Sequence, residues 1–312
     1  MTKIIFMGTP DFSVPILKEL HKEFGVDLVI SQPSRPVGRK KVMTDPPVAL
    51  AAKLLGIELY QPETMKSEAA FKIVSDLKPD LIITAAFGQL LPENILNIPV
   101  LGALNVHASL LPKHRGGAPI HRAVINGDTE TGVTLMYMAE KLDAGDIIAS
   151  RSIKIEDSDN TGTMFDKLSR VGASLLMDTL PAVLDETNER TPQNDLDATF
   201  SPNILKSDEV ISFNRPAREV FNHIRGLAPW PVGHTMLGDK RLKLFSAELT
   251  DQRTDKEPGT ITGKSDSGFL VAAADELVNI TEVQLAGKKK NKALDFINNN
   301  SDLIGRKLGE DI

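Results

Sequence analysis

The chain has 312 residues, which favours two domains, and its 41% hydrophobic and 25% charged residues are typical of a globular protein. The absence of cysteine excludes disulfides and thiolate metal sites. The formal net charge of −6 argues against a protein whose surface is covered by nucleic acid. No apolar run approaches the ~20 residues of a membrane span, and the first residues enter a strand, so we expect a cytoplasmic protein without a signal peptide.

Buried strands and helices alternate through the first part of the chain. Strands are predicted at residues 3–8, 27–31, 57–60, 80–85, 102–107, 133–138 and 146–155. Helices are predicted at residues 14–21, 47–55, 68–77, 118–126 and 163–186, the last interrupted near Pro181. This alternation predicts an α/β fold with an open, mostly parallel, Rossmann-like sheet, whose ligand lies beyond the carboxyl ends of the strands. The first strand and helix lack G-x-G-x-x-G, so a dinucleotide cofactor is not predicted.

The last third of the chain has a different organisation. Residues 190–206 are polar, contain prolines and lack a period, which predicts a linker between a first domain at 1–189 and a second at 207–312. A helix at 216–227 is followed by short strands around glycine-containing turns. Short strands at this spacing predict a small β-barrel.

The stretch 101–119, LGALNVHASLLPKHRGGAP, is the strongest candidate for a functional site. Asn105 and His107 occupy alternate positions of a predicted strand, so their side chains point to the same face. Asp143 follows in a turn, LDAGD. An amide donor beside a histidine and a carboxylate suits acyl transfer to an amine, and no serine of this stretch lies in a G-x-S-x-G elbow. The same residues also fit a capped turn around a hydrogen-bonded core histidine.

Several motifs together resemble one enzyme family over nearly the whole chain. They are N-x-H-x-S-L-L-P-x-x-R-G from Asn105, L-D-x-G-D from Leu142, MGTPDF, AFGQLLP at 86–92, NGDTETGVTL at 126–135 and Q-P-x-R-P-x-G-R at 32–39. The chain resembles the formyltransferases that use 10-formyltetrahydrofolate. The resemblance implies a formyltransferase fold with an OB-like second domain, and formyl transfer to the α-amine of methionine on initiator tRNA, for translation initiation. It implies no metal.

The resemblance also assigns roles to individual residues. It implies that Asn105, His107 and Asp143 are the catalytic trio, with the amide and imidazole stabilising the oxyanion and the carboxylate holding His107. Residues that would contact the folate donor are Ser109, Leu110, Leu111, Pro112, Phe87, Gly88 and Leu90.

Two basic segments have no role in the predicted chemistry. Their charge alone predicts that both segments are solvated surface. The resemblance implies instead that the loop 32–44 enters the tRNA acceptor end and that Arg39 probes the first base pair. The second segment, in the barrel, would bind phosphate in a salt-sensitive manner. The candidate tRNA contacts are Arg35, Arg39, Lys40, Lys41, Lys288, Lys289 and Lys290.

Three other functions remain open at this point. A formyltransferase acting on a nucleotide-linked amino sugar would share the trio and the second domain, but has less need of the loop with Arg39. A purine-pathway relative would lack the second domain. A non-catalytic RNA-binding protein with the same fold would not need Asn105, His107 and Asp143 together. We expect a monomer that binds no membrane.

Overall fold

The computed structural model describes residues 2–38 and 40–309, which form two compact units. The first unit holds the chain up to Pro119 together with Thr131–Ile153 and Phe165–Ser201. The second holds Ile120–Glu130, Lys154–Met164 and the chain from Pro202 onward. Each unit therefore draws on more than one stretch of sequence, and the domain boundaries expected above stay a prediction.

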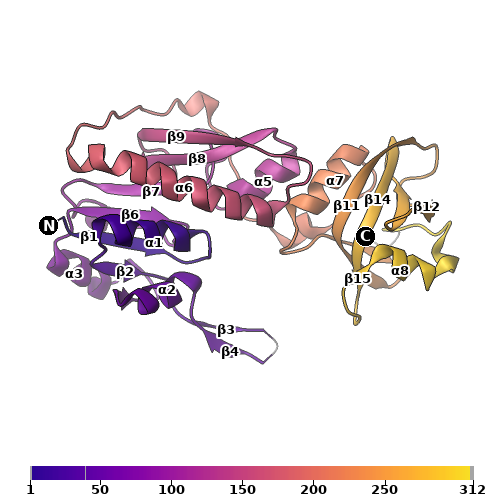
Figure 1. The fold of residues 1–312 in the computed structure, drawn as a ribbon, viewed down its shortest axis with the longest axis horizontal. Helices are drawn as coiled ribbons and strands as arrows, with labels where there is room; N and C mark the ends of the chain where they lie inside the picture. The colour runs from indigo at the N-terminus through magenta and orange to yellow at the C-terminus, as the bar shows by residue number, and fades with distance from the viewer. Residues whose placement is uncertain (1, 39, 310–312) are drawn as a thin grey trace. The chain divides into compact units, whose positions relative to one another are not determined.

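A mostly parallel sheet of seven strands forms the centre of the first unit (Figure 1). Its strands, in spatial order, are β5 (Glu58–Tyr60), β2 (Leu28–Ile30), β1 (Ile4–Gly8), β6 (Leu81–Ala85), β7 (Ala103–His107), β8 (Glu130–Tyr137) and β9 (Ile147–Lys154). Pairing is parallel from β5 to β7, whereas β7 and β8 are antiparallel. The predicted Rossmann-like sheet is confirmed.

Helices cover both faces of this sheet because its central strands are buried on both sides. The first unit contains α1 (Ser13–Phe24), α2 (Pro47–Leu55), α3 (Glu68–Leu77) and α4 (Glu93–Leu96). All of α5 (Pro119–Asn126) after its first residue belongs to the second unit, and α6 (Thr161–Leu184) begins in the second unit and belongs to the first from Phe165 onward. Ile5 and Met7 of β1 share a core with Ala70 and Val74 of α3. On the other face, a Cβ at Gly172 of α6 would lie 2.9 Å from Val106 of β7 and 3.5 Å from Ile16 of α1. In Figure 1, α1 and α6 accordingly lie across the same side of the sheet.

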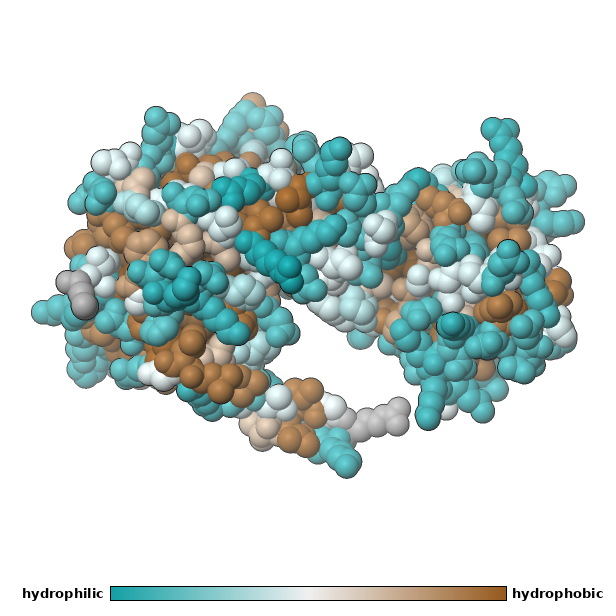
Figure 2. Space-filling model, viewed as in Figure 1, coloured by the Kyte–Doolittle hydropathy of each residue, from teal (hydrophilic) through white to brown (hydrophobic). Residues whose placement is uncertain are grey.

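The basic segment after β2 forms a β-hairpin, where the sequence predicted a loop. Strands β3 (Arg35–Val37) and β4 (Val42–Thr44) pair antiparallel, with Arg35 opposite Thr44 and Val37 opposite Val42. Val37, Val42 and Met43 are each more than half exposed, and Figure 2 shows hydrophobic residues at the surface of this hairpin. Strands this short and exposed carry no buried alternation in their sequence, which is why the pattern did not predict them.

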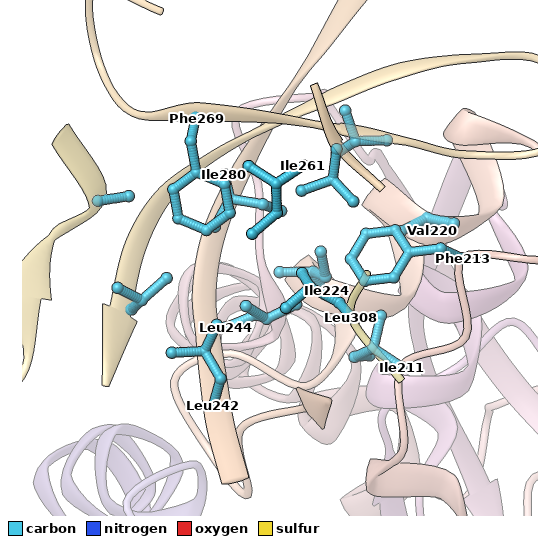
Figure 3. Packing of buried hydrophobic residues seen from close by; sticks show 14 of the residues in the cluster. Ile211, Phe213, Val220, Ile224, Leu242, Leu244, Ile261, Phe269, Ile280 and Leu308 are labelled. Carbon is cyan, nitrogen blue, oxygen red and sulfur yellow. The ribbon is translucent and has the colours of Figure 1, made fainter. Parts of the chain in front are cut away.

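The second unit is built around an antiparallel sheet and one amphipathic helix. Its sheet, consistent with a small barrel, contains β10 (His234–Leu237), β11 (Lys240–Arg253), β14 (Glu276–Leu285), β13 (Phe269–Ala272) and β12 (Ile261–Lys264), with β15 (Asn291–Lys292) paired to β14. The helices from Pro202 onward are α7 (Ala217–Gly226) and α8 (Ala293–Asn298). Val220 and Ile224 of α7 share one buried hydrophobic core with Leu244 of β11 and Ile280 of β14 (Figure 3). This core confirms a second, mainly β, domain.

None of the helices formed by residues 2–38 and 40–309 is both long enough and apolar enough to cross a bilayer.

Candidate active site

Asn105 is the central residue of β7, two residues before its carboxyl end. Its neighbour is Thr84 of β6, paired with it in the sheet, and the Thr84 hydroxyl donates a hydrogen bond of 2.9 Å to Asn105 Oδ1. Because the amide oxygen is engaged in this way, the NH2 group is the end of Asn105 that can donate to a bound molecule. The side chain is half-buried, so the donor works in partly desolvated surroundings, where a hydrogen bond is stronger than in water.

His107 ends β7 and is 7% exposed. Its Nε2 atom lies 3.1 Å from the carbonyl oxygen of His114. A carbonyl only accepts, so Nε2 carries the proton in the neutral ring and Nδ1 is left as the basic nitrogen. Nδ1 lies 3.7 Å from Oδ1 of Asp143, which is ion-pair distance once the ring is protonated. The predicted meeting of His107 and Asp143 therefore occurs.

Asp143 lies in the turn between β8 and β9 and has a left-handed backbone, with φ of 49°. Its other carboxylate oxygen, Oδ2, accepts a 2.8 Å hydrogen bond from the backbone N–H of Gly116. The loop after β7 thus contributes a donor that holds the carboxylate. The side chain is only 10% exposed and its Oδ2 atom is held by the Gly116 N–H, so it has little freedom to rotate.

The polar segment predicted as a linker makes extensive contacts with the loop after β7. Thr199 accepts hydrogen bonds from the backbone N–H groups of His114 and Arg115, through its hydroxyl and its carbonyl oxygen respectively. Ser201 bonds to the imidazole of His114 and to the backbone of Arg115. The same segment pairs Thr191 with Ile147 of β9. Residues 191–201 therefore brace the site.

A buried arginine connects this segment to the site. Arg115 is 1% exposed, and its guanidinium donates to Gln193 Oε1 and, at 2.8 Å, to Asp195 Oδ1. Hydrogen bonds from Lys141 and from Arg115 hold the pKa of Asp195 below its ordinary value. The Gln193 NH2 group donates to the carbonyl oxygens of Asp143 and Gly145. Sequence reasoning missed Gln193 because a glutamine in an irregular polar segment carries no local signal.

The predicted folate contacts form two stretches near the carboxyl ends of β6 and β7. Ser109 is buried; its hydroxyl donates to Lys113 and its carbonyl accepts from Thr134. The Leu111 N–H donates to the Thr134 hydroxyl, and Leu110 and Pro112 on either side are half-buried. Phe87 is buried after β6, whereas Gly88 is exposed and Leu90 is 67% exposed.

The predicted tRNA contacts that the structure describes are all exposed. Arg35 of β3 pairs with Glu63 at 2.5 Å, Lys40 and Lys41 lie in the hairpin turn, and Arg39 lies outside the described residues. Lys288, Lys289 and Lys290 are exposed between β14 and β15. Lys290 pairs with Glu282 at 2.9 Å and lies over the ring of Phe245.

Two family models match the chain and together span most of it. Residues 2–180 match the model described as formyl transferase, and residues 203–301 match the model described as formyl transferase, C-terminal domain. The chain belongs to the formyl transferase family. This membership agrees with the arrangement of the chain into an α/β unit and a mainly β unit.

Similar proteins extend this family assignment over the full length. The methionyl-tRNA formyltransferase of Macrococcus caseolyticus is 55% identical over 311 residues, covering 99% of this chain and 100% of that protein. The methionyl-tRNA formyltransferase of Staphylococcus aureus is 54% identical over 310 residues, with the same coverage. The similarity therefore extends over both units of this chain.

Solved structures agree on the fold of this family member. An N-formyltransferase from Helicobacter canadensis, in complex with folinic acid and dTDP-3-aminofucose, superposes with a TM-score of 0.69 at 17% identity, over 90% of this chain and 99% of that one. HypX from Aquifex aeolicus, in complex with tetrahydrofolic acid, gives a TM-score of 0.63 at 16% identity, over 94% of this chain and 46% of that one.

Proposed function

We propose that this chain transfers the formyl group of 10-formyltetrahydrofolate to the α-amino group of methionine on initiator methionyl-tRNA. The observation that carries the proposal is full-length identity of 54–55% to methionyl-tRNA formyltransferases. The arrangement of Asn105, His107 and Asp143 supports it, because these side chains supply what formyl transfer to an amine requires.

The reaction joins the amine nitrogen to the formyl carbon and breaks the bond between that carbon and N10 of the folate. Attack by the neutral amine creates a tetrahedral centre with a negative oxygen, which the NH2 group of Asn105 would stabilise, joined by the His107 ring once that ring has taken up a proton. The amine then has to lose a proton. His107 Nδ1 can take it, and the Asp143 carboxylate at 3.7 Å would stabilise the imidazolium that forms. Returning that proton to N10 completes the transfer and releases tetrahydrofolate.

The folate donor would lie against the two stretches at the carboxyl ends of β6 and β7. Backbone around Phe87, Gly88 and Leu90 would line the pterin pocket, and residues 109–112 would form the opposite wall. The Thr134 hydroxyl donates to the Ser109 carbonyl and accepts from the Leu111 N–H, which supports this role, since these hydrogen bonds fix the shape of that wall before the donor arrives.

The tRNA would be bound by exposed basic residues of both units. The hairpin carries Lys40 and Lys41 at its turn, and Arg39, proposed to probe the first base pair, directly precedes Lys40 in the sequence. Lys288 and Lys289 offer further phosphate contacts. We also propose that the protein is a monomer and acts in the cytoplasm. Sedimentation of the purified protein would test the first property, and fractionation of cells would test the second.

One assay tests the proposed reaction. The purified protein is incubated with 10-formyltetrahydrofolate and either methionyl-tRNA or a nucleotide-linked amino sugar, and formyl transfer to each acceptor is followed. We expect transfer to methionyl-tRNA and loss of turnover by orders of magnitude in Asn105→Ala, His107→Ala and Asp143→Ala, with the fold retained. Transfer to the amino sugar alone, or wild-type rates in all three variants, would refute the assignment.

A further inference from the structure

Gln193 connects two parts of the first unit that are distant in sequence. Its NH2 group donates to the carbonyl oxygens of Asp143 and Gly145, at 2.9 and 2.8 Å. Its side-chain oxygen accepts from Nε and Nη2 of Arg115, at 3.1 and 2.8 Å. Because a carbonyl only accepts and a guanidinium only donates, these four contacts fix which end of the amide points in each direction.

The turn that carries Asp143 needs support from outside. Its φ of 49° is an uncommon conformation for a residue with a side chain, and such residues persist where their surroundings hold them. Gln193 binds the carbonyl groups on both sides of Ala144. The turn is therefore clamped at its backbone, on the residue whose carboxylate faces His107.

Arg115 makes this clamp rigid. The guanidinium is buried, is held by Asp195 at 2.8 Å, and belongs to the residue directly before Gly116. The Gly116 N–H donates to Oδ2 of Asp143. One arginine–glutamine pair thus fixes both the backbone of the turn and the donor that holds the Asp143 carboxylate.

We propose that Gln193 is a positioning residue for formyl transfer, acting through the carbonyl groups of Asp143 and Gly145 to keep the Asp143 carboxylate beside His107. This inference rests on the proposed function, in which that carboxylate stabilises the imidazolium. Gln193 acts only by positioning Asp143, so its replacement lowers the rate of the chemical step and leaves the affinity for 10-formyltetrahydrofolate unchanged.

Two substitutions separate the donor role of Gln193 from its packing. Gln193→Glu keeps the shape of the side chain and an oxygen that Arg115 can bind, but its carboxylate can donate to neither carbonyl group. Gln193→Leu removes all four contacts. We expect each to lower kcat for formylation of methionyl-tRNA on the order of 10- to 100-fold, with KM for 10-formyltetrahydrofolate changed less than about twofold. Leu196→Ala is the control, because Leu196 lies in the same segment and is 93% exposed.

A double-mutant cycle shows whether Gln193 acts through Asp143. In single-turnover measurements, Gln193→Glu added to Asp143→Ala should change the rate by less than about twofold, since the group it positions is gone. Multiplicative losses, or wild-type kcat in Gln193→Glu, would overturn the inference while leaving the proposed function intact. Wild-type protein that transfers no formyl group to methionyl-tRNA would overturn both.

Discussion

The imidazole Nδ1 of His107 lies 3.7 Å from the carboxylate oxygen Oδ1 of Asp143. The opposite ring nitrogen is bonded to the carbonyl of His114, so the nitrogen that faces the carboxylate is the one that can accept a further proton. The other carboxylate oxygen is bonded to Gly116. This orientation suits the role proposed for the pair, in which Nδ1 takes a proton from the attacking amine.

Removing the charge of Asp143 while keeping its shape tests this pair. Asp143→Asn can retain a side-chain oxygen for the Gly116 N–H but no longer stabilises an imidazolium. We expect kcat for formyl transfer to fall about 10²- to 10⁴-fold, with the thermal unfolding midpoint close to that of the wild type. Asp251→Asn, which changes an exposed carboxylate of β11, is the matched control. A kcat close to the wild-type value would show that proton transfer does not use Asp143.

Gly145 makes the turn of Asp143 sensitive to a single methyl group. A Cβ at this position would lie 1.9 Å from the carbonyl oxygen of Tyr137, and backbone cannot move aside as a flexible side chain would. Gly145→Ala should displace the turn, with kcat lowered at least about tenfold and stability lowered by about 1–3 kcal/mol. The control is Gly263→Ala, where the added Cβ meets no atom within 4 Å. Equal activity and equal unfolding free energy in the two variants would contradict the prediction.

Local signals in the sequence predict the elements of the first unit well. Helices α2 and α3 begin and end where expected, because Pro47 starts one and Ser67 caps the other by accepting from Ala70. A partnership of His107 with Asp143 was also predicted: the residue types favoured a histidine and a carboxylate acting together in acyl transfer, and the family resemblance named both as members of the catalytic trio. Contacts between distant segments were not predictable in this way.

The contacts of residues 191–201 with the site could not be predicted from sequence patterns. The composition of this segment is that of a linker, and nothing local indicates that Thr199 and Ser201 bind the loop after β7 or that Gln193 binds the turn of Asp143. These contacts depend on the tertiary arrangement. A single sequence reports burial through periodicity, and an irregular segment has none.

Stability of the second unit should depend on the protonation of His223. Burial, the largest cause, lowers the pKa of His223 from 6.5 to about 4, and its ring bonds to Arg215 through Nδ1 and to the carbonyl of Asp208 through Nε2. Between pH 6.5 and 4 the unfolded chain binds a proton that the folded chain excludes. The stabilising contribution of the neutral His223 ring to the free energy of unfolding is therefore fully present above about pH 6.5 and is lost as the pH falls toward 4.

Urea unfolding at pH 7 and pH 5 measures this effect. Wild-type protein should lose about 2 kcal/mol more unfolding free energy on acidification than His223→Gln, whose amide can replace both hydrogen bonds without titrating. His121 and His234, whose pKa values burial also lowers, remain in both proteins and cancel in the comparison. Identical pH dependence in the two proteins would rule out the assignment to His223.

The lysines between β14 and β15 should differ in their contribution to tRNA binding. Lys290 pairs with Glu282 and lies over Phe245, so it would have to give up a partner to reach a phosphate. Lys288 and Lys289 are exposed and carry the charge that the proposed function needs. Replacing both with alanine should reduce the slope of log affinity against log salt by about 2, and Lys290→Ala should reduce it by less than about 1.

Titration of methionyl-tRNA binding at several salt concentrations measures these slopes, because each phosphate contact releases bound counterions. Arg306→Ala serves as the control: this exposed arginine of the same unit pairs with Asp302. If the affinity of the wild-type protein for methionyl-tRNA did not change with salt, the electrostatic role proposed for the second unit would be refuted. A larger loss from Lys290 than from Lys288 and Lys289 together would place the phosphate contact on the opposite side of this turn, next to Phe245.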